Sequence, residues 1–271
     1  MLIDIHAHTN WLGLDTDAWA AHFRSLGVDK VWLLSCHGTS VFRHEMEGDF
    51  STEAALCEAA RYPDLFIPFC SFLPWEEDVV DKIEDAVERG CRGFGEHKIR
   101  LCIDNPDCIK VFDACGALGL PVLFHIDIPL PDSDMWYNVD ASRLPWVLDR
   151  CSRTVFVGHG PGFWREISGD ADESPSAYPS GPVTSGGRLL SLLGGFENLY
   201  CDLSAGSGLN AIRRDPEFGR QFLIDHGDRC MYGTDFNDSS LLDHLRSLEL
   251  PARVWGRIAH RNAAKLVPLA G

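Results

Sequence analysis

Two histidines near the start of the chain have the spacing of a metal-ligand pair. The first residues read Leu-Ile-Asp-Ile-His-Ala-His-Thr, so His6 and His8 lie two positions apart in an apolar, strand-like run. Because alternate side chains of a strand point to the same side, both imidazoles are predicted to face one point, with Asp4 on that side too. Neutral imidazole is a common ligand of zinc, iron, nickel and manganese-type ions. The pair therefore predicts half of a metal site, and structural histidines are the alternative.

Further polar residues follow other apolar runs of the chain. They are His37, the stretch from Glu96 to Lys98, His125 with Asp127, His159, and Asp235. Imidazole and carboxylate groups are the ligands that a catalytic divalent ion uses while one coordination position stays open for water. The set predicts a catalytic metal centre if the fold brings these run ends together.

The predicted elements do bring them together. Apolar runs of strand length alternate with stretches of helical spacing. The strands are predicted at 2–6, 30–34, 65–69, 91–96, 121–125, 154–158, 199–202 and 230–233, and the helices at 17–26, 52–61, 76–89, 107–118, 142–150, 184–193, 209–226 and 239–248. This alternation predicts one α/β domain over residues 1–271, a (β/α)8 TIM barrel whose strand ends meet at one mouth. A doubly wound sheet is the alternative, but no Gly-x-Gly-x-x-Gly loop follows an early strand.

Two segments depart from this alternation. Residues 160–182 are rich in Gly, Pro, Ser and Asp and follow the sixth strand, so they are predicted to form a long active-site loop. Residues 258–267 are predicted to form a closing helix packed on the barrel.

Composition limits the partners. The 271 residues carry a formal net charge of -16, which disfavours nucleic acid and anionic membrane surfaces and favours a small-molecule substrate. No run approaches the roughly 18 apolar residues of a membrane span, and no secretion signal is expected. The ten cysteines include no Cys-x-x-Cys pair and are interpreted as small buried residues of a cytoplasmic protein. The number of associating chains stays open, with a homo-oligomer as one option.

The sequence segments around the polar residues resemble those of a known family. The segments Asp-Ile-His-Ala-His, Gly-Leu-Pro-Val-Leu-Phe-His, Val-Gly-His-Gly, Tyr-Gly-Thr-Asp-Phe and Ala-His-Arg-Asn-Ala-Ala-Lys-Leu are similar to the amidohydrolase-related (amidohydrolase 2) family of the amidohydrolase superfamily, over essentially the whole chain. The resemblance implies a distorted barrel, a catalytic divalent metal, and metal ligands at His6, His8, His125 and Asp235. It also implies that His159 binds a second metal or contacts the substrate and the activated water.

The fourth strand leaves two interpretations open. Glu96 and Lys98 have the same parity, so either could face the barrel interior. Some branches of the superfamily bridge two metals with a carboxylated lysine, whereas TatD-like hydrolases use a glutamate in a Gly-Glu context similar to Gly95-Glu96. Glu96 is the favoured ligand, and it would bridge to a second ion held by His125 and His159. Alternatively, Glu96 hydrogen-bonds to a ligand histidine.

Residues near the predicted mouth could shape a substrate pocket. The candidates are Lys98, Arg100, Asp127, Trp164, Arg165 and Arg213. Aromatic walls and guanidinium groups suit a substrate that bears a carboxylate, although each residue alone is as compatible with a surface or packing role.

The leading functional hypothesis is hydrolysis of a small-molecule amide, ester or lactone. Zn2+ is the favoured ion, as one or two per chain, with Mn2+, Fe2+ or Ni2+ as alternatives. Asp235 would act as the general base, and the metal or His159 would polarise the carbonyl group. The alternatives are a metal-dependent decarboxylase of a small carboxylic acid, a TatD-like phosphoester hydrolase and a barrel that only binds a ligand.

Overall fold

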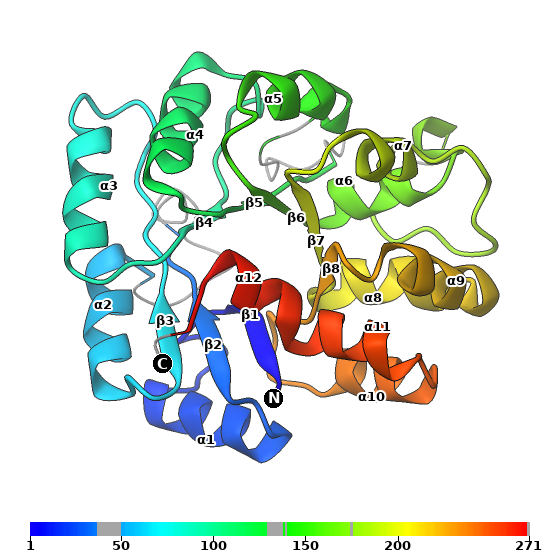
Figure 1. Ribbon diagram of the computed structural model, residues 1–271, viewed down its shortest axis with the longest axis horizontal. Coiled ribbons are helices and arrows are strands. Elements are labelled where there is room, and N and C mark those ends of the chain that lie inside the picture. The colour runs from blue at the N-terminus through cyan, green and yellow to red at the C-terminus, as the bar shows by residue number, and fades with distance from the viewer. Residues whose placement is uncertain (37–49, 129–137, 139, 174–175, 270–271) are drawn as a thin grey trace.

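The protein forms a barrel of parallel strands surrounded by helices (Figure 1). The computed structural model describes residues 1–36, 50–128, 138, 140–173 and 176–269. Its strands are β1 (Ile3–Ala7), β2 (Lys30–Leu33), β3 (Phe66–Pro68), β4 (Phe94–His97), β5 (Val122–His125), β6 (Phe156–His159), β7 (Leu199–Asp202) and β8 (Cys230–Met231). Each overlaps a strand predicted from the sequence, and the predicted α/β barrel class is confirmed.

Backbone hydrogen bonds connect the strands in chain order. One sheet has the order β1-β2-β3, and the other has the order β4-β5-β6-β7-β8. Between the two sheets, Cys70 N donates to Gly93 O (3.0 Å) and Gly95 N donates to Cys70 O (2.8 Å). At the other seam, Ile5 N donates to Tyr232 O (3.0 Å). The carboxyl ends of all strands therefore open at the same end of the barrel.

Helices follow most strands and cover the outside of the barrel. They are α1 (Thr16–Leu26), α2 (Thr52–Arg61), α3 (Val79–Glu88), α4 (Pro106–Leu118), α5 (Leu144–Arg150), α6 (Pro161–Trp164), α7 (Arg188–Gly195), α8 (Ala205–Arg213), α9 (Pro216–His226), α10 (Ser240–Ser247), α11 (Ala252–Gly256) and α12 (Asn262–Leu266), with short turns η2 (Ala141–Arg143), η3 (Arg165–Ile167), η4 (Ala171–Glu173) and the π-helical η5 (Arg257–Arg261). None of the described helices has the length and apolar character required to cross a membrane.

Two predicted segments differ from the structure for local reasons. The single helix expected at 209–226 is two helices, α8 and α9. Pro216 begins α9 and Asp215 caps it by accepting a hydrogen bond from Phe218 N (3.2 Å), because proline cannot continue a helix but fits its first turn. The segment expected as a loop after β6 contains α6, η3 and η4 within residues 161–173.

Apolar side chains fill the barrel interior below the mouth. Trp32, Leu123, Val157, Tyr200 and Met231 are contributed by different strands and are buried in one apolar cluster. Ala263 and Val267 belong to the same cluster, so α12 and the residue after it close the barrel at its base. The predicted closing helix corresponds to η5 and α12, with Ile258 and Val267 buried.

A β-bulge in β1 changes which residues face the interior. Asp4 pairs with Val31, yet Ala7 pairs with Leu33, so β1 contains one extra residue between these positions. Ile3 and Ile5 belong to the interior cluster, whereas Asp4 does not join the metal-facing groups. The expectation that Asp4 shares one side with His6 and His8 is therefore wrong. Its Oδ1 instead accepts hydrogen bonds from His6 N (3.0 Å) and Thr234 N (3.1 Å).

One buried histidine of β4 points away from the interior. The His97 ring packs against Phe94 and Phe112, at centroid distances of 5.9 and 5.1 Å. Its Nε2 is buried without a hydrogen-bond partner among the described residues. Burial lowers the pKa of His97 to about 3.

We expect His97 to make the fold sensitive to acid. The folded chain keeps this imidazole neutral while the unfolded chain protonates it near pH 6.5, so stability is lost as pH falls from 6.5 towards 3. Between pH 7.5 and 5 the loss attributable to His97 is about 2 kcal/mol. Urea unfolding at both pH values should show this loss to be absent in His97→Leu and present in the half-exposed control His226→Gln. Equal pH dependence of His97→Leu and the unmodified protein would contradict the assignment.

Candidate metal centre

Each strand-one histidine is held through one ring nitrogen. His6 Nδ1 lies 2.6 Å from Asp202 Oδ2 and His8 Nδ1 lies 3.0 Å from Leu34 O. Because both partners are acceptors, each Nδ1 carries the proton in the neutral imidazole and each Nε2 presents its lone pair. This is the arrangement in which an outer hydrogen bond orients a metal-binding histidine.

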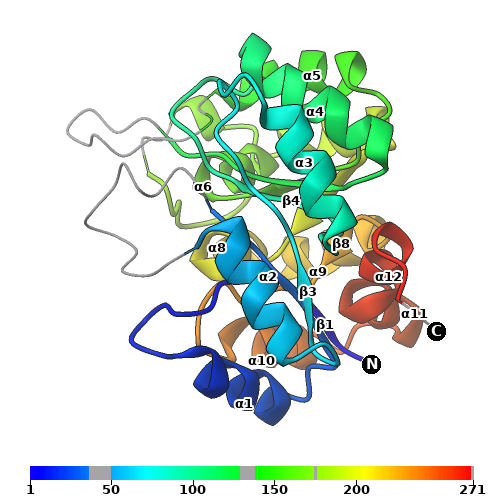
Figure 2. The same ribbon diagram turned by 90° about the vertical axis from the view of Figure 1, so that its left-hand side faces the viewer.

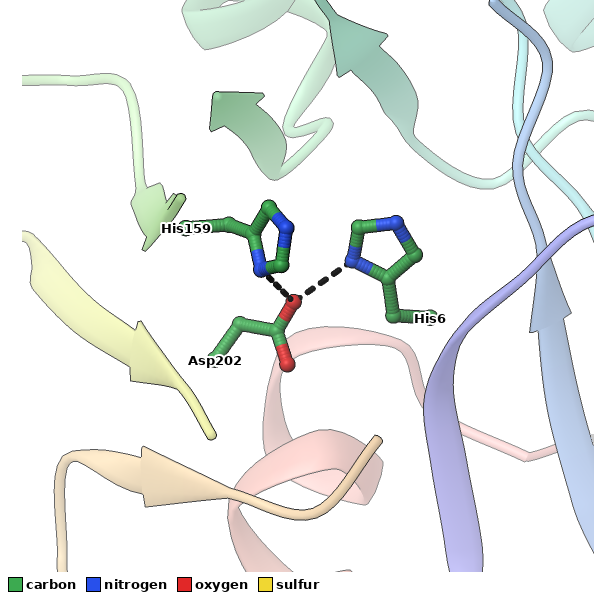
Figure 3. A group of neighbouring side chains, drawn as sticks. All are labelled: His6, His159 and Asp202. Atoms are coloured by element: carbon green, nitrogen blue, oxygen red, sulfur yellow. Dashed lines mark hydrogen bonds and ion pairs between the residues drawn. The ribbon is translucent and has the colours of Figure 1, made fainter. Parts of the chain in front are cut away.

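His159, at the end of β6, shares the acceptor of His6. Its Nδ1 lies 3.1 Å from Asp202 Oδ2 and 3.1 Å from Ser204 Oγ. Ser204 Oγ also donates to Asp202 Oδ2 (2.7 Å). Figure 3 shows both imidazoles converging on a single oxygen of Asp202. The Asp202 carboxylate therefore fixes two imidazoles from opposite sides.

His125, at the end of β5, lies between two carboxylates. Its Nε2 is 2.9 Å from Asp127 Oδ1, and its Nδ1 is 2.8 Å from Glu96 Oε1. Asp127 is half-buried towards the mouth, whereas Glu96 is buried. Asp127 is thus the outer partner of this ring, and Nδ1 faces the centre of the site.

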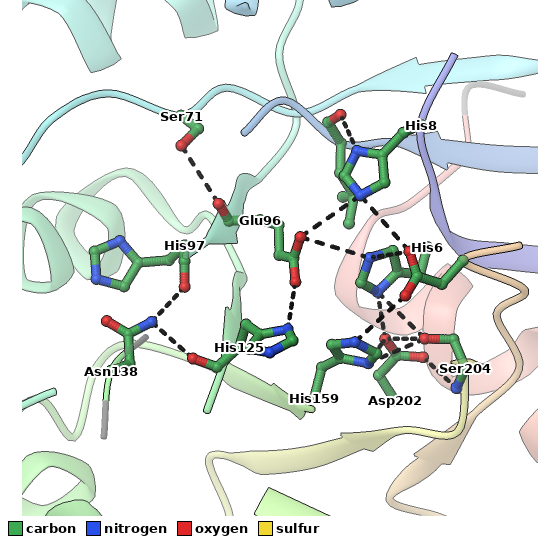
Figure 4. Close-up of polar contacts among 12 residues, drawn as sticks. His6, His8, Ser71, Glu96, His97, His125, Asn138, His159, Asp202 and Ser204 are labelled. Atoms are coloured by element: carbon green, nitrogen blue, oxygen red, sulfur yellow. Dashed lines mark hydrogen bonds and ion pairs between the residues drawn. The ribbon is translucent and has the colours of Figure 1, made fainter. Parts of the chain in front are cut away.

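Figure 4 shows Glu96 between His8 and His125, and Asp235 is the second carboxylate that faces the imidazoles. Glu96 Oε2 lies 3.6 Å from His8 Nε2 and 4.0 Å from His6 Nε2. Asp235 Oδ1 lies 3.3 Å from His6 Nε2 and 3.8 Å from His8 Nε2, and Asp235 Oδ2 lies 3.6 Å from His159 Nε2. The inner nitrogens and the two carboxylates face one another across the mouth.

The donor set fits divalent ions. His6 Nε2 and His8 Nε2 are buried and have no hydrogen-bond partner among the described residues. Burying such a nitrogen is unfavourable unless another group satisfies it, and a cation bound to nitrogen and oxygen ligands would do so. Ligand atoms within 4.8 Å of one another occur in the groups His6-His8-Asp235 and Glu96-His125-His159. Either group could hold an ion.

The charged groups of the centre shift one another's pKa values. Burial opposes the imidazolium form of His6, but Asp235 and Asp202 outweigh it and raise the pKa of His6 to about 10. Burial disfavours the charged form of Glu96, but Lys98 and His125 hold its pKa well below the usual range. Burial and the neighbouring His6 lower the pKa of His159. The Glu96 carboxylate thus remains charged, and the centre favours positive charge, either a proton on His6 or a bound cation.

Asp202 and Ser204 were not among the residues singled out from the sequence. A signal was available, because Asp202 ends β7 with the same parity as the interior residue Tyr200, as His125 and His159 do in their strands. The absence of a side chain at Gly233 leaves space for Asp202 and His6, because a Cβ there would lie 3.0 Å from Asp202 Oδ1 and 3.0 Å from His6 Cβ.

Two of the predicted substrate contacts, Asp127 and Lys98, interact with groups of the centre. Asp127 contacts His125, as described above. Lys98 follows β4, and although burial lowers its pKa, Glu96 and the other nearby acidic groups raise it, so the ammonium group stays charged. Arg100 is half-buried two residues further on.

The other three predicted contacts have different surroundings. Trp164 is buried, and its indole Nε1–H donates a hydrogen bond to Asp202 O (2.8 Å), so the ring lies against the end of β7. Arg165 is half-buried and lines a small cavity with Trp164 and Pro179. Arg213 is exposed at the last residue of α8. His37 lies outside the described residues. Substrate roles for these residues stay predictions.

A parallel barrel with histidines and carboxylates gathered at its strand ends defines the class of metal-dependent barrel enzymes. The family model described as Amidohydrolase matches residues 3–269, so this chain belongs to the amidohydrolase family. A search of curated proteins gave no match.

Solved structures share the fold at low sequence identity. A 5-carboxyvanillate decarboxylase from Sphingomonas paucimobilis is 17% identical, with a TM-score of 0.66 and coverage of 99% of each chain. A protein from Acinetobacter baumannii described as a probable 2-pyrone-4,6-dicarboxylic acid hydrolase is 13% identical, with a TM-score of 0.62 and 98% coverage of each chain. A dihydroxybenzoic acid decarboxylase from Polaromonas sp. JS666, solved with bound manganese, is 14% identical, with a TM-score of 0.63 and coverage of 98% of this chain and 96% of the other.

We expect Asp202→Asn to weaken metal binding. The asparagine keeps the size of the side chain but removes the charge that orients His6 and His159, and such outer partners contribute about 10- to 100-fold to metal affinity. Chelator competition with Zn2+ and Mn2+ should show this loss, whereas the exposed control Asp225→Asn should bind normally. Unchanged affinity of a folded Asp202→Asn protein would contradict the orienting role.

Proposed function

We propose that this chain is a hydrolase of a small-molecule amide, ester or lactone that uses two divalent ions. The observation that carries the proposal is the orientation of four imidazoles, each with one nitrogen at an outer acceptor and the other facing Glu96 or Asp235. Zn2+ suits these nitrogen and oxygen ligands, and Mn2+, Fe2+ and Ni2+ are alternatives.

In this proposal the ligands divide into two sets. His6, His8 and Asp235 would hold one ion, and His125 and His159 would hold the other. Glu96 lies between them, since its Oε2 faces His8 and its Oε1 faces His125. A carboxylate with its two oxygens directed at different ligand sets is suited to bridge a two-metal centre.

The bound ions would supply activated water, because coordination lowers the pKa of water from ~15.7 towards ~7. Asp235 accepts the proton of the attacking water and passes it to the leaving group, since its carboxylate is the more accessible one of the centre. His159 Nε2 is a ligand in this arrangement, so the metal would polarise the carbonyl oxygen of the substrate. Lys98 provides a positive charge at the mouth for an anionic part of the substrate.

Decarboxylation is the second candidate, because several structures with this fold are named as decarboxylases. In that reaction one ion and Lys98 would hold the substrate carboxylate, and Asp235 would remain a ligand. Products distinguish the candidates, since a decarboxylase releases carbon dioxide and a hydrolase consumes water. A screen of lactones, esters, amides and aromatic carboxylates would test both.

We also propose that the protein is cytoplasmic and that its partner is a small molecule. None of the ten cysteines, all of which lie in the described part of the chain, forms a disulfide, and this includes the neighbouring pairs Cys70 with Cys91 and Cys201 with Cys230. Free thiols in such numbers are typical of the reducing cytoplasm. The net charge of -16 favours a small molecule over nucleic acid or a membrane surface, and a homo-oligomer is compatible with it.

The two-ion proposal predicts metal stoichiometry. Purified protein should contain about two divalent ions per chain, and Glu96→Gln should lose at least one of them because the amide cannot bridge as an anion. Elemental analysis after gel filtration measures this, with the exposed Glu217→Gln as the control. A single ion in the unmodified protein, unchanged in Glu96→Gln, would contradict the bridging role.

The general-base role predicts the effect of Asp235→Asn. Turnover should fall by about 100-fold or more, as expected for a lost general base, while the fold is retained. Steady-state kinetics at equal metal occupancy measure this fall, with Asp238→Asn in the same exposed loop as the control. Near-normal turnover of a metal-loaded Asp235→Asn protein would exclude the role.

A further inference from the structure

A second polar pocket lies at the base of the barrel. It has a volume of about 410 Å³ and is lined by residues that precede β7 and β8, by Tyr200, and by η5 and α12. The metal centre lies at the carboxyl ends of the strands, so this pocket lies at the other end. Figure 2 shows α11 and α12 on the side of the molecule opposite α6, which follows β6.

Basic side chains dominate the pocket. Arg229, Arg257, Arg261 and Lys265 line it together with the acidic Glu197 and Asp228. Among the described residues, none of these four basic side chains has a carboxylate oxygen within 4.0 Å, whereas Arg24, Arg89 and Arg150 elsewhere form ion pairs. An excess of positive charge in one pocket is unusual on a chain of net charge -16 and attracts anions.

Tyr200 fixes two of the four basic groups. Lys265 Nζ donates to Tyr200 Oη (2.9 Å), and the Arg229 guanidinium lies over the Tyr200 ring at 5.6 Å from its centroid. Arg229 Nη1 also donates to Phe196 O (2.9 Å) and Leu199 O (3.3 Å). These two cations are therefore held in place before any ligand arrives, which lowers the entropic cost of binding.

The other two basic residues, Arg257 and Arg261, lie in one turn of helix. Arg257 and Arg261 begin and end the π-helical turn η5, and Lys265 follows four residues later in α12. π-helical turns are rare overall, and many of those that occur are located at functional sites. Neither guanidinium forms a hydrogen bond within the described part of the chain, so their planar donor groups remain available. Arg261 lies against Gly256, where a Cβ would come within 2.1 Å of Arg261 Nη2.

We propose that this pocket binds a phosphate group, either as free phosphate or as part of a small metabolite. Guanidinium groups bind phosphate through paired, charge-assisted hydrogen bonds, and a lysine adds a point charge. The site is independent of the metal centre and of the hydrolase proposal, because no residue is shared between the two.

The test is calorimetric titration of the purified full-length protein with inorganic phosphate and with pyrophosphate, against chloride at equal ionic strength. We expect saturable binding of one phosphate probe or both. The double variant Arg257→Ala/Arg261→Ala should bind at least about tenfold more weakly, because it removes two of the guanidinium groups that line the pocket. Arg253→Ala, on α11 outside the pocket, should bind normally.

Phosphate that bound at the metal centre instead would give a different pattern. Its affinity would be equal in the double variant and the unmodified protein, and it would fall in His6→Ala. That pattern, or the absence of saturable binding beyond chloride, would overturn the proposal. Gly256→Ala is a second variant that displaces the Arg261 guanidinium without removing charge, and it should also weaken binding.

Discussion

The arrangement of the mouth depends on which nitrogen of each imidazole is held from outside. A neutral imidazole has one donor and one acceptor nitrogen, so an outer carboxylate or carbonyl determines that the inner nitrogen carries a lone pair. Asp202, Asp127 and Leu34 O supply these outer acceptors. Without these acceptors, no group on the outer side would fix the orientation and the tautomer of the rings.

The fold supplies these acceptors through simple alternation along the strands. Tyr200 and Asp202 lie on one face of β7, so the same strand contributes to the interior layer and to the orientation of His6 and His159. His125 and His159 occupy adjacent register positions on β5 and β6. Most of the centre therefore follows from parallel strands ending at one level.

This regularity explains what could be predicted from the sequence. The eight strands could be predicted because each is a short apolar run, and the convergence of His125, His159 and Asp235 could be predicted because each ends or follows such a run. The bulge of β1 could not be found, since it depends on pairing with β2 and leaves no mark in composition. Asp215 and Pro216 indicate the boundary between α8 and α9. The helical spacing of the residues on both sides nevertheless led to the prediction of a single helix. Substrate contacts depend on loop geometry, which spacing does not determine.

Asp235 has one structural property that restricts its exchange for other residues. Its backbone is left-handed, with φ of 58°, and its N–H donates to His6 O (2.8 Å). Aspartate and asparagine tolerate this conformation better than other residues with a Cβ, so glutamate would combine backbone strain with a longer arm. The two acidic amino acids are therefore not equivalent at this position. Of the two acidic residues, only the shorter one combines a carboxylate beside His6, His8 and His159 with a left-handed turn of the chain at low strain.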